Sequence, residues 1–295
     1  MFYEDDTGQL TYSQISMDVR NQVVQSNTMI RGRQDLSLTE AKLIRIIMMQ
    51  IIGNDLEFKP YSLSPGELAK LVGNSDSVNM YHNAKAICDG IMKKQLEIVS
   101  DDGSWIKYQW VSQCEYNART KKILIMLNDK LAPFLLGLVQ KGYYTQYSLD
   151  NTLQMNSIYA LRVFELIQES LKTKLLPVDG TRITLNKQTI IDACMLYKTD
   201  RRGELVLDEN KKPMEKYSSV SMLRQRIIKI ACDEISDKTE YYIPYESDDP
   251  EKCVKPVKQG REVVGFDFYI NTHVHEDVLK QKKATRTIGV VPINS

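Results

Sequence analysis

The chain has 295 residues, 42% of them hydrophobic and 26% charged, which is enough for two globular domains with separate cores. Lys and Arg number 39 against 38 Asp and Glu. With a net charge so close to zero, the protein as a whole does not attract nucleic acid electrostatically, so any DNA contact must come from local basic surfaces. Five scattered cysteines, an acidic N-terminus and the lack of an apolar run of about 18 residues argue against a disulfide framework, a zinc site, a signal peptide and a membrane span, and predict a cytoplasmic protein.

The first half reads as three helices followed by strands. A Ser-Leu-Thr-Glu capping box at 37–40 begins a helix with a wide apolar face, and a second capping box at 64–67 begins a shorter helix that stops at Gly73. A third helix is expected over about 78–95, before a hairpin that turns at 101–103 and one further strand. This is the order of a winged helix-turn-helix domain.

The second half repeats this order without repeating the sequence. A core helix is expected over 156–171, and a second helix, capped by Thr184, over 185–196. A charged insert, 198–215, precedes a third helix, and two strands then enclose a turn-rich loop. The segment between the halves, 128–149, is too apolar to be a flexible tether, so we expect it to be packed.

The predicted fold class is therefore α+β, with two tandem winged helix-turn-helix domains. The first spans 23–150, including the connecting segment, and the second spans 151–272. They lie between an N-terminal segment, 1–22, and a basic C-terminal tail, 273–295. We expect the second domain to be the main DNA-reading domain.

The third helix of the second half lies in the segment Lys216–Tyr245. Its apolar residues recur at helical spacing and predict one buried face, formed by Val220, Leu223, Ile227, Ile230 and Ala231. No acidic residue occurs between Lys216 and Cys232, and Glu234 is expected near the buried face in a structural role. A helix that is apolar on one side and cationic on the other suits a DNA-reading helix, although a solvated surface helix has the same pattern.

In a winged-helix domain the third helix enters the major groove, where Arg can form two hydrogen bonds with guanine. We expect Arg226, and also Arg224, to contact bases, whereas Lys and Ser contact phosphates. The second-domain DNA-binding candidates are Lys216, Ser218, Ser219, Arg224, Gln225, Arg226, Lys229, Lys252, Lys255, Lys258 and Arg261. The first-domain candidates are His82, Asn83, Lys85, Lys93 and Lys94. The third helix of the first domain is expected to recognise DNA sequence less well, because it lacks arginine and carries Asp89. For the wing residues 252–261 a solvated charged loop is an equal alternative.

One histidine pair needs a separate interpretation. His273-Val-His275 has the spacing of the metal site in rolling-circle nicking enzymes, which also need a third ligand and a tyrosine nucleophile. His82 is the only other histidine and no tyrosine follows His275, so surface histidines are the preferred interpretation. No phosphate-binding loop or hydrolase motif occurs, so we expect neither catalysis nor a cofactor or metal.

Three segments together resemble one family. They are VVQSNTMIRGRQDLSLTEAKLIRIIMMQI near the N-terminus, NSIYALRVFELI in the middle and YSSVSMLRQRIIKIACDEISDKTEYYIPYE in the second half. In this order they resemble the signatures of the Rep_3 iteron-type plasmid replication initiators. The resemblance implies that both domains bind one origin repeat, with their third helices in successive major grooves. It also implies monomers that open the origin, dimers joined through the first domain that repress their own gene, and a host initiator and replicative helicase as partners.

Three alternatives remain open at this point. A winged-helix transcriptional regulator without initiator activity would use the same DNA contacts. A nicking enzyme would use His273 and His275. A protein-interaction module would fold in the same way without contacting DNA. Tandem direct repeats beside an AT-rich tract would favour initiation, whereas one inverted repeat would favour regulation alone.

Overall fold

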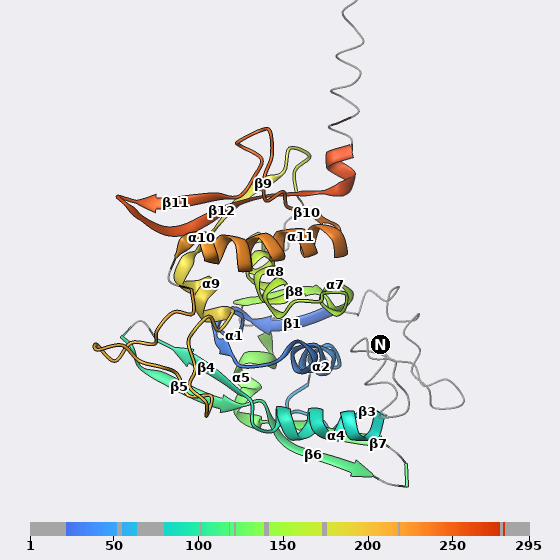
Figure 1. Cartoon of the computed structure of the whole chain (residues 1–295). Helices are drawn as coiled ribbons and strands as arrows, with labels where there is room; N and C mark the ends of the chain where they lie inside the picture. The colour runs from blue at the N-terminus through green and yellow to red at the C-terminus, as the bar shows by residue number, and fades with distance from the viewer. Residues whose placement is uncertain are drawn as a thin grey trace, which may run out of the picture.

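The computed structural model describes most of the chain (Figure 1). The described residues are 22–51, 55–63, 80–100, 102–117, 119–120, 122–138, 142–172, 176–217, 219–277 and 280. Of residues 80–84 only the backbone is described. The helix expected to begin at the second capping box, 64–67, lies outside these residues.

The first half begins with short strands and a buried helix. Its elements are β1 (Gln22–Ser26), α1 (Asn27–Arg31), β2 (Arg33–Gln34), α2 (Leu38–Met49), β3 (Tyr61–Leu63), α4 (Met80–Ile91), β4 (Gln95–Val99), β5 (Trp105–Gln109), β6 (Val111–Asn117) and β7 (Lys122–Leu127). The capping box before α2 is confirmed: Ser37 Oγ accepts from Glu40 N, and Glu40 Oε2 accepts from Ser37 N at 2.7 Å. Nearly all of α2 after this cap is buried, as its wide apolar face predicted.

The predicted hairpin and the strand after it are also present. β4 pairs with β5 in the order β2-β4-β5, and β6 continues into a second sheet with the order β3-β7-β6. Trp110, between β5 and β6, is fully buried, whereas Trp105 near the hairpin turn is 64% exposed. The chain therefore passes from the first sheet to the second at Trp110, between β5 and β6.

The segment between the halves is packed, as predicted, and consists of short elements. It contains the short helices η3 (Asp129–Leu131) and α5 (Ala132–Leu135), the strand β8 (Tyr144–Ser148) and the helix α7 (Leu149–Leu153). β8 pairs antiparallel with β1 along its whole length. Backbone pairing across more than a hundred residues therefore fixes this connection.

The second half forms a helical layer against a sheet. Its elements are α8 (Ile158–Leu171), β9 (Thr181–Asn186), α9 (Lys187–Ala193), α10 (Val220–Leu223), η4 (Arg224–Ile228), α11 (Lys229–Lys238), β10 (Tyr241–Tyr242), β11 (Lys255–Gln259) and β12 (Glu262–Thr272). The sheet has the order β10-β12-β11, and β9 also pairs with β12. The prediction that Thr184 caps α9 was wrong. Thr184 lies within β9, and Asn186 caps the helix by accepting from Gln188 N at 2.7 Å.

The insert at 198–215 folds as two consecutive loops of the same construction. In the first, Asp200 Oδ1 accepts from two backbone N–H groups at 2.8 and 2.9 Å, and in the second Asp208 Oδ1 does the same at 2.9 and 2.8 Å. Backbone hydrogen bonds also join Lys198, Val206 and Met214 to one another. The insert is therefore an ordered projection.

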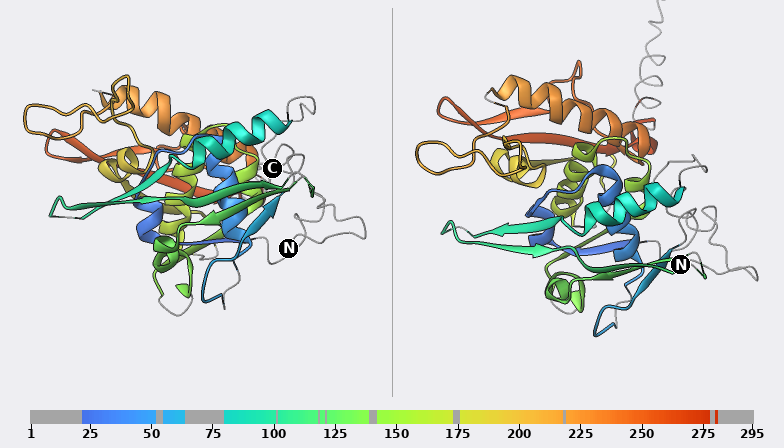
Figure 2. Two further views of the ribbon diagram at one scale, coloured as in Figure 1. Left: turned by 90° about the horizontal axis from the view of Figure 1, so that it is seen from below. Right: turned by 60° about the horizontal axis from the view of Figure 1, so that its bottom comes forward.

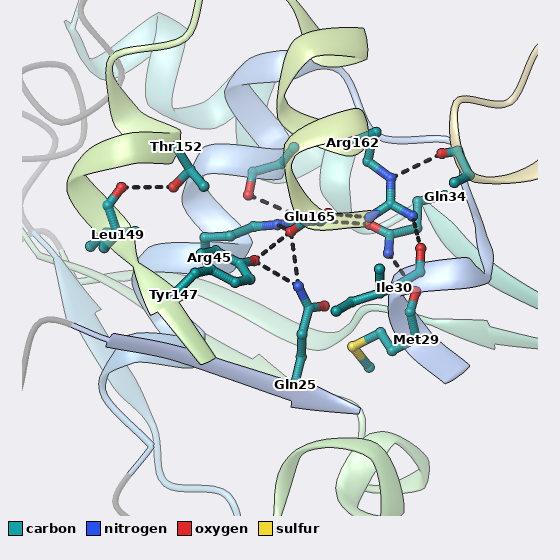
Figure 3. A network of polar contacts seen from close by, with 12 residues as sticks. Gln25, Met29, Ile30, Gln34, Arg45, Tyr147, Leu149, Thr152, Arg162 and Glu165 are labelled. Carbon is teal, nitrogen blue, oxygen red and sulfur yellow. Dashed lines mark hydrogen bonds and ion pairs between the residues drawn. The ribbon is translucent and has the colours of Figure 1, made fainter. Parts of the chain in front are cut away.

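A buried ionic network joins the two halves (Figure 3). Glu165 on α8 is fully buried and accepts two hydrogen bonds from Arg45 on α2, at 2.9 and 3.0 Å. It also accepts from Arg162, Tyr147 and, at 2.8 Å, Gln25. Burial raises the pKa of Glu165, but the charges of Arg45 and Arg162 outweigh this effect and lower it to about 2. The carboxylate therefore stays ionised inside the interface between the two halves.

Candidate nucleic-acid interface

The third helix of the second domain is continuous from α10 through η4 to α11, and η4 is π-helical. Burial along it repeats every four residues. One row is buried and consists of Leu223, Ile227, Ala231 and Ile235. The adjacent row has Ile228 and Cys232 buried between half-buried Arg224 and Ser236. Two rows face outward, one with Ser221, Gln225, Lys229, Asp233 and Asp237, the other with Met222, Arg226 and Ile230.

This pattern corrects the predicted buried face. Ile230 was expected in the core but is 38% exposed, and Ile228 is fully buried in its place. A π-helical turn closes with i→i+5 hydrogen bonds and so holds more residues than the 3.6 of an α-helix. The turn at η4 therefore shifts all later residues around the axis, and residues four apart line up in straight rows.

The two arginines of this helix lie differently. Arg226 is exposed, and no ion pair or hydrogen bond engages its side chain among the described residues. Arg224 is half-buried, with its guanidinium carbon 5.3 Å from the centre of the Tyr245 ring. Lys229 forms an ion pair with Asp233 at 2.7 Å, while Gln225 is exposed beside Arg226. Arg226 is thus the outward-facing arginine of the helix.

Residues just before α10 form hydrogen bonds within the protein, and one of them caps the helix. Ser219 Oγ accepts from Met222 N at 3.2 Å and caps the helix, so this hydroxyl has a structural contact. Lys216 is exposed and donates to the Tyr159 hydroxyl at 3.4 Å. Ser218 lies outside the described residues. Glu234 has the structural role expected of it, because its carboxylate accepts from Asn156 N and Ser157 N at 3.1 Å.

The equivalent helix of the first domain is α4. Lys85 and Lys93 are exposed on α4 or just after it, and Asp89 is exposed between them. Lys94 is half-buried, with its ammonium group 3.9 Å from the Glu40 carboxylate. The side chains of His82 and Asn83 lie outside the described part. The outward face of α4 thus carries separated lysines with an acid between them.

The four wing cations do not form one patch. Lys258 and Arg261 are exposed at the tip of the β11–β12 hairpin, where Gly260 has a φ of 64°. Lys252 instead lies over the Tyr269 ring, 5.5 Å from its centre, and Lys255 forms an ion pair with Glu251. The wing tip therefore has two unpaired cations within the described structure.

Both third helices lie on one side of the molecule. In the left view of Figure 2, α4 and α10–α11 run along the same upper surface, and the insert projects next to them. In Figure 1 the same two helices lie below and above α2. A duplex that crosses this surface can meet both helices.

The two histidines near the C-terminal end have local contacts. They follow β12 in a helical turn rather than lying on the strand. The His273 Nε2 atom lies 2.7 Å from Ser236 O, and the His275 Nδ1 atom lies 3.3 Å from Asn271 Oδ1. Within the described ranges, no group of three or more His, Cys, Asp or Glu side chains could hold a metal ion.

Two further findings concern the whole chain. All five cysteines are described, and all are free thiols. None of the helices in the described part has the length and apolar character needed to cross a bilayer.

Comparison with known families decides what this arrangement represents. Residues 22–168 match the WH1 model of the initiator replication proteins, and residues 211–270 match the WH2 model of the initiator Rep proteins. The chain therefore belongs to the Rep_3 family of replication initiators. The predicted family and the α+β fold with two winged-helix domains are both confirmed. Most of the insert, 198–210, lies between the two matched ranges.

A solved initiator structure shows the same fold. The chain is similar to the Pi initiator protein in complex with iteron DNA, with a TM-score of 0.65 and 13% identity over 87% of this chain and 100% of that chain. The WH1 domain of the replication protein MSBI1.176 is 19% identical, with a TM-score of 0.27 over 41% of this chain and 88% of that domain. Domains 2 and 3 of RctB are 9% identical, with a TM-score of 0.40 over 82% of this chain and 85% of that chain. No curated protein sequence matches the chain.

Proposed function

We propose that this Rep_3 initiator binds repeated double-stranded DNA sites, the iterons of its plasmid origin, without catalysis of its own. The observation that carries the proposal is the outward face of α10–η4–α11, where Arg226 is exposed and no acid occurs before Asp233, on the surface that also carries α4. The likeness in fold to the Pi initiator, which was solved with iteron DNA, supports this mode of binding.

In this proposal the second domain reads bases and the first domain positions the protein. Arg226 forms the two hydrogen bonds with guanine that specify sequence. Lys216 before the helix and Lys258 and Arg261 at the wing tip contact phosphates, which fix position without reading bases. Lys85 and Lys93 on the first domain do the same in the next major groove. Binding at adjacent repeats then distorts a neighbouring AT-rich tract and recruits the host initiator and helicase.

The first domain would also join two copies in the form that represses its own gene. β5 is the end strand of the order β2-β4-β5, so its outer edge has no partner strand among the described residues. Its side chains include Trp105, 64% exposed, and Ile106, 48% exposed. Exposed aromatic and aliphatic side chains on an unpaired edge are suited to pairing with a second copy.

Footprinting on supercoiled DNA that flanks its own gene tests the proposal. We expect protection of several direct repeats, and permanganate-reactive thymines in an adjoining AT-rich tract. Protection of one inverted repeat without reactive thymines would instead indicate a regulator that does not initiate replication. Failure to protect any duplex at low salt would contradict DNA binding altogether, and a protein-linked nick would identify a nicking enzyme.

A further inference from the structure

One outward row of the reading helix alternates apolar and cationic side chains. Met222 is 44% exposed and Ile230 is 38% exposed, with Arg226 between them in the same row. Apolar side chains in this position do not serve the domain's own core, because the buried row is formed by residues that directly follow each of them. The π-helical turn in η4 keeps the three side chains in line.

We propose that the row Met222–Arg226–Ile230 reads a guanine flanked on both sides by thymines. The thymine C5-methyl group is the only apolar group that a base presents in the major groove, and apolar side chains recognise it by contact. An arginine recognises guanine through O6 and N7. The side chains of the row therefore match the chemistry of a guanine with one thymine methyl group on each side of it along the groove, and each thymine can be on either strand.

The spacing of the row limits where the thymines lie. Four residues rise about 6 Å along a helix, and base pairs are stacked about 3.4 Å apart. Each thymine methyl should thus lie about two base pairs from the guanine. The reading row ends near Ile230, because Asp233 begins the acidic part of the exposed surface.

This inference rests on the proposed DNA binding and adds the identity of the bases. It is tested with the duplex that footprinting defines, by replacing each thymine in turn with deoxyuridine. Deoxyuridine pairs in the same way and lacks only the methyl group. We expect wild-type protein to lose about fourfold in affinity at one thymine on each side of the guanine, which corresponds to about 0.8 kcal/mol for one buried methyl group.

Single variants then assign each methyl group to a side chain. Met222→Ala should remove the thymine preference at one position and Ile230→Ala at the other, each without further loss on deoxyuridine DNA. Val274→Ala is the matched control, because Val274 is a 71% exposed apolar residue outside the reading helix. It should keep both preferences.

Two results would overturn the inference. One is equal affinity for thymine and deoxyuridine at every position that the second domain protects. The other is a thymine preference that both alanine variants retain. Either result leaves the proposed function standing if Arg226→Ala still loses specific binding, so the two failures are distinguishable.

Discussion

The third helices of the two domains occupy equivalent places but differ in chemistry. On α4, exposed Asp89 lies between Lys85 and Lys93, and the helix packs closely on α2, where a Cβ at Gly90 would lie 2.6 Å from Glu40 Oε1. On α10–η4–α11 the exposed residues up to Ile230 include no acid, and Arg226 faces outward. This difference in charge supports the proposed division of roles, in which the second domain reads bases and the first contacts the DNA backbone and a second copy.

The largest effect is expected at the buried ionic network between α2 and α8. Glu165→Gln leaves Arg45 and Arg162 buried without their carboxylate, which should lower the free energy of unfolding by about 3–5 kcal/mol. Urea unfolding followed by circular dichroism measures this. Glu251→Gln is the control, because Glu251 forms an exposed ion pair and should cost less than about 1 kcal/mol. A loss for Glu165→Gln no larger than that of the control would show that the stability of the fold does not depend on this network.

Acid should weaken the same network. The pKa of Glu165 is lowered to about 2 from its usual 4.5, so the folded state favours the ionised form. This contribution to stability is complete above about pH 4.5 and is lost as pH falls towards 2. We expect the wild-type melting temperature to fall over this range more steeply than that of Glu165→Gln. Parallel pH profiles for the two proteins would exclude this carboxylate as a cause.

The reading helices can be compared by charge reversal. Arg226→Glu should reduce binding to the repeat at least a hundredfold, since it removes a base contact worth about 1–3 kcal/mol and adds repulsion. Lys85→Glu on α4 should cost less and should weaken specific and nonspecific DNA alike. Fluorescence anisotropy at one fixed salt concentration gives both affinities. Equal losses for the two variants would remove the proposed division between the domains.

Association of the first domain is tested at its strand edge. Trp105→Lys should weaken a dimer by about 2 kcal/mol or more, because exposed aromatic side chains commonly dominate interfaces. Analytical ultracentrifugation over a range of concentrations measures the change. Met222→Lys, in the second domain, should leave the association constant unchanged. A dimer that tolerates a lysine at residue 105 must use another surface.

The smallest effect concerns the two kinds of wing lysine. Lys258→Ala should lower the slope of log affinity against log salt by about one unit, as expected for one lost phosphate contact. Lys252→Ala should leave the slope unchanged, because Lys252 lies over Tyr269 rather than at the wing tip. Salt titrations of both variants on the same duplex measure this. A reduced slope for Lys252→Ala would place the DNA on a different face of the wing.

The sequence by itself determined the family, the two winged-helix domains and the helices α2, α4, α8 and α10–α11, but it did not predict the short strands β1, β2, β3, β8 and β9. The features that it determined depend on local patterns: the capping box at Ser37, the apolar spacing of α2 and α8, and the run from Lys216 to Cys232 without acid. Local patterns also predicted the packed connector and the structural place of Glu234. Thr184 was wrongly predicted to cap a helix, because the sequence does not show hydrogen-bond partners. Without them, a threonine that caps a helix cannot be distinguished from a threonine within a strand.

Only the tertiary structure decided which side chains meet. The exposure of Ile230 depends on a π-helical turn, which helical spacing from sequence assumes to be absent. The burial of Arg45, Arg162 and Glu165 depends on two helices more than a hundred residues apart, since each charge is tolerated in the core only beside its partners. In the same way, Tyr269 and Glu251 separate Lys252 and Lys255 from the cations at the wing tip. Periodicity determines the elements, whereas the neighbours brought by folding determine which charges remain free to meet DNA.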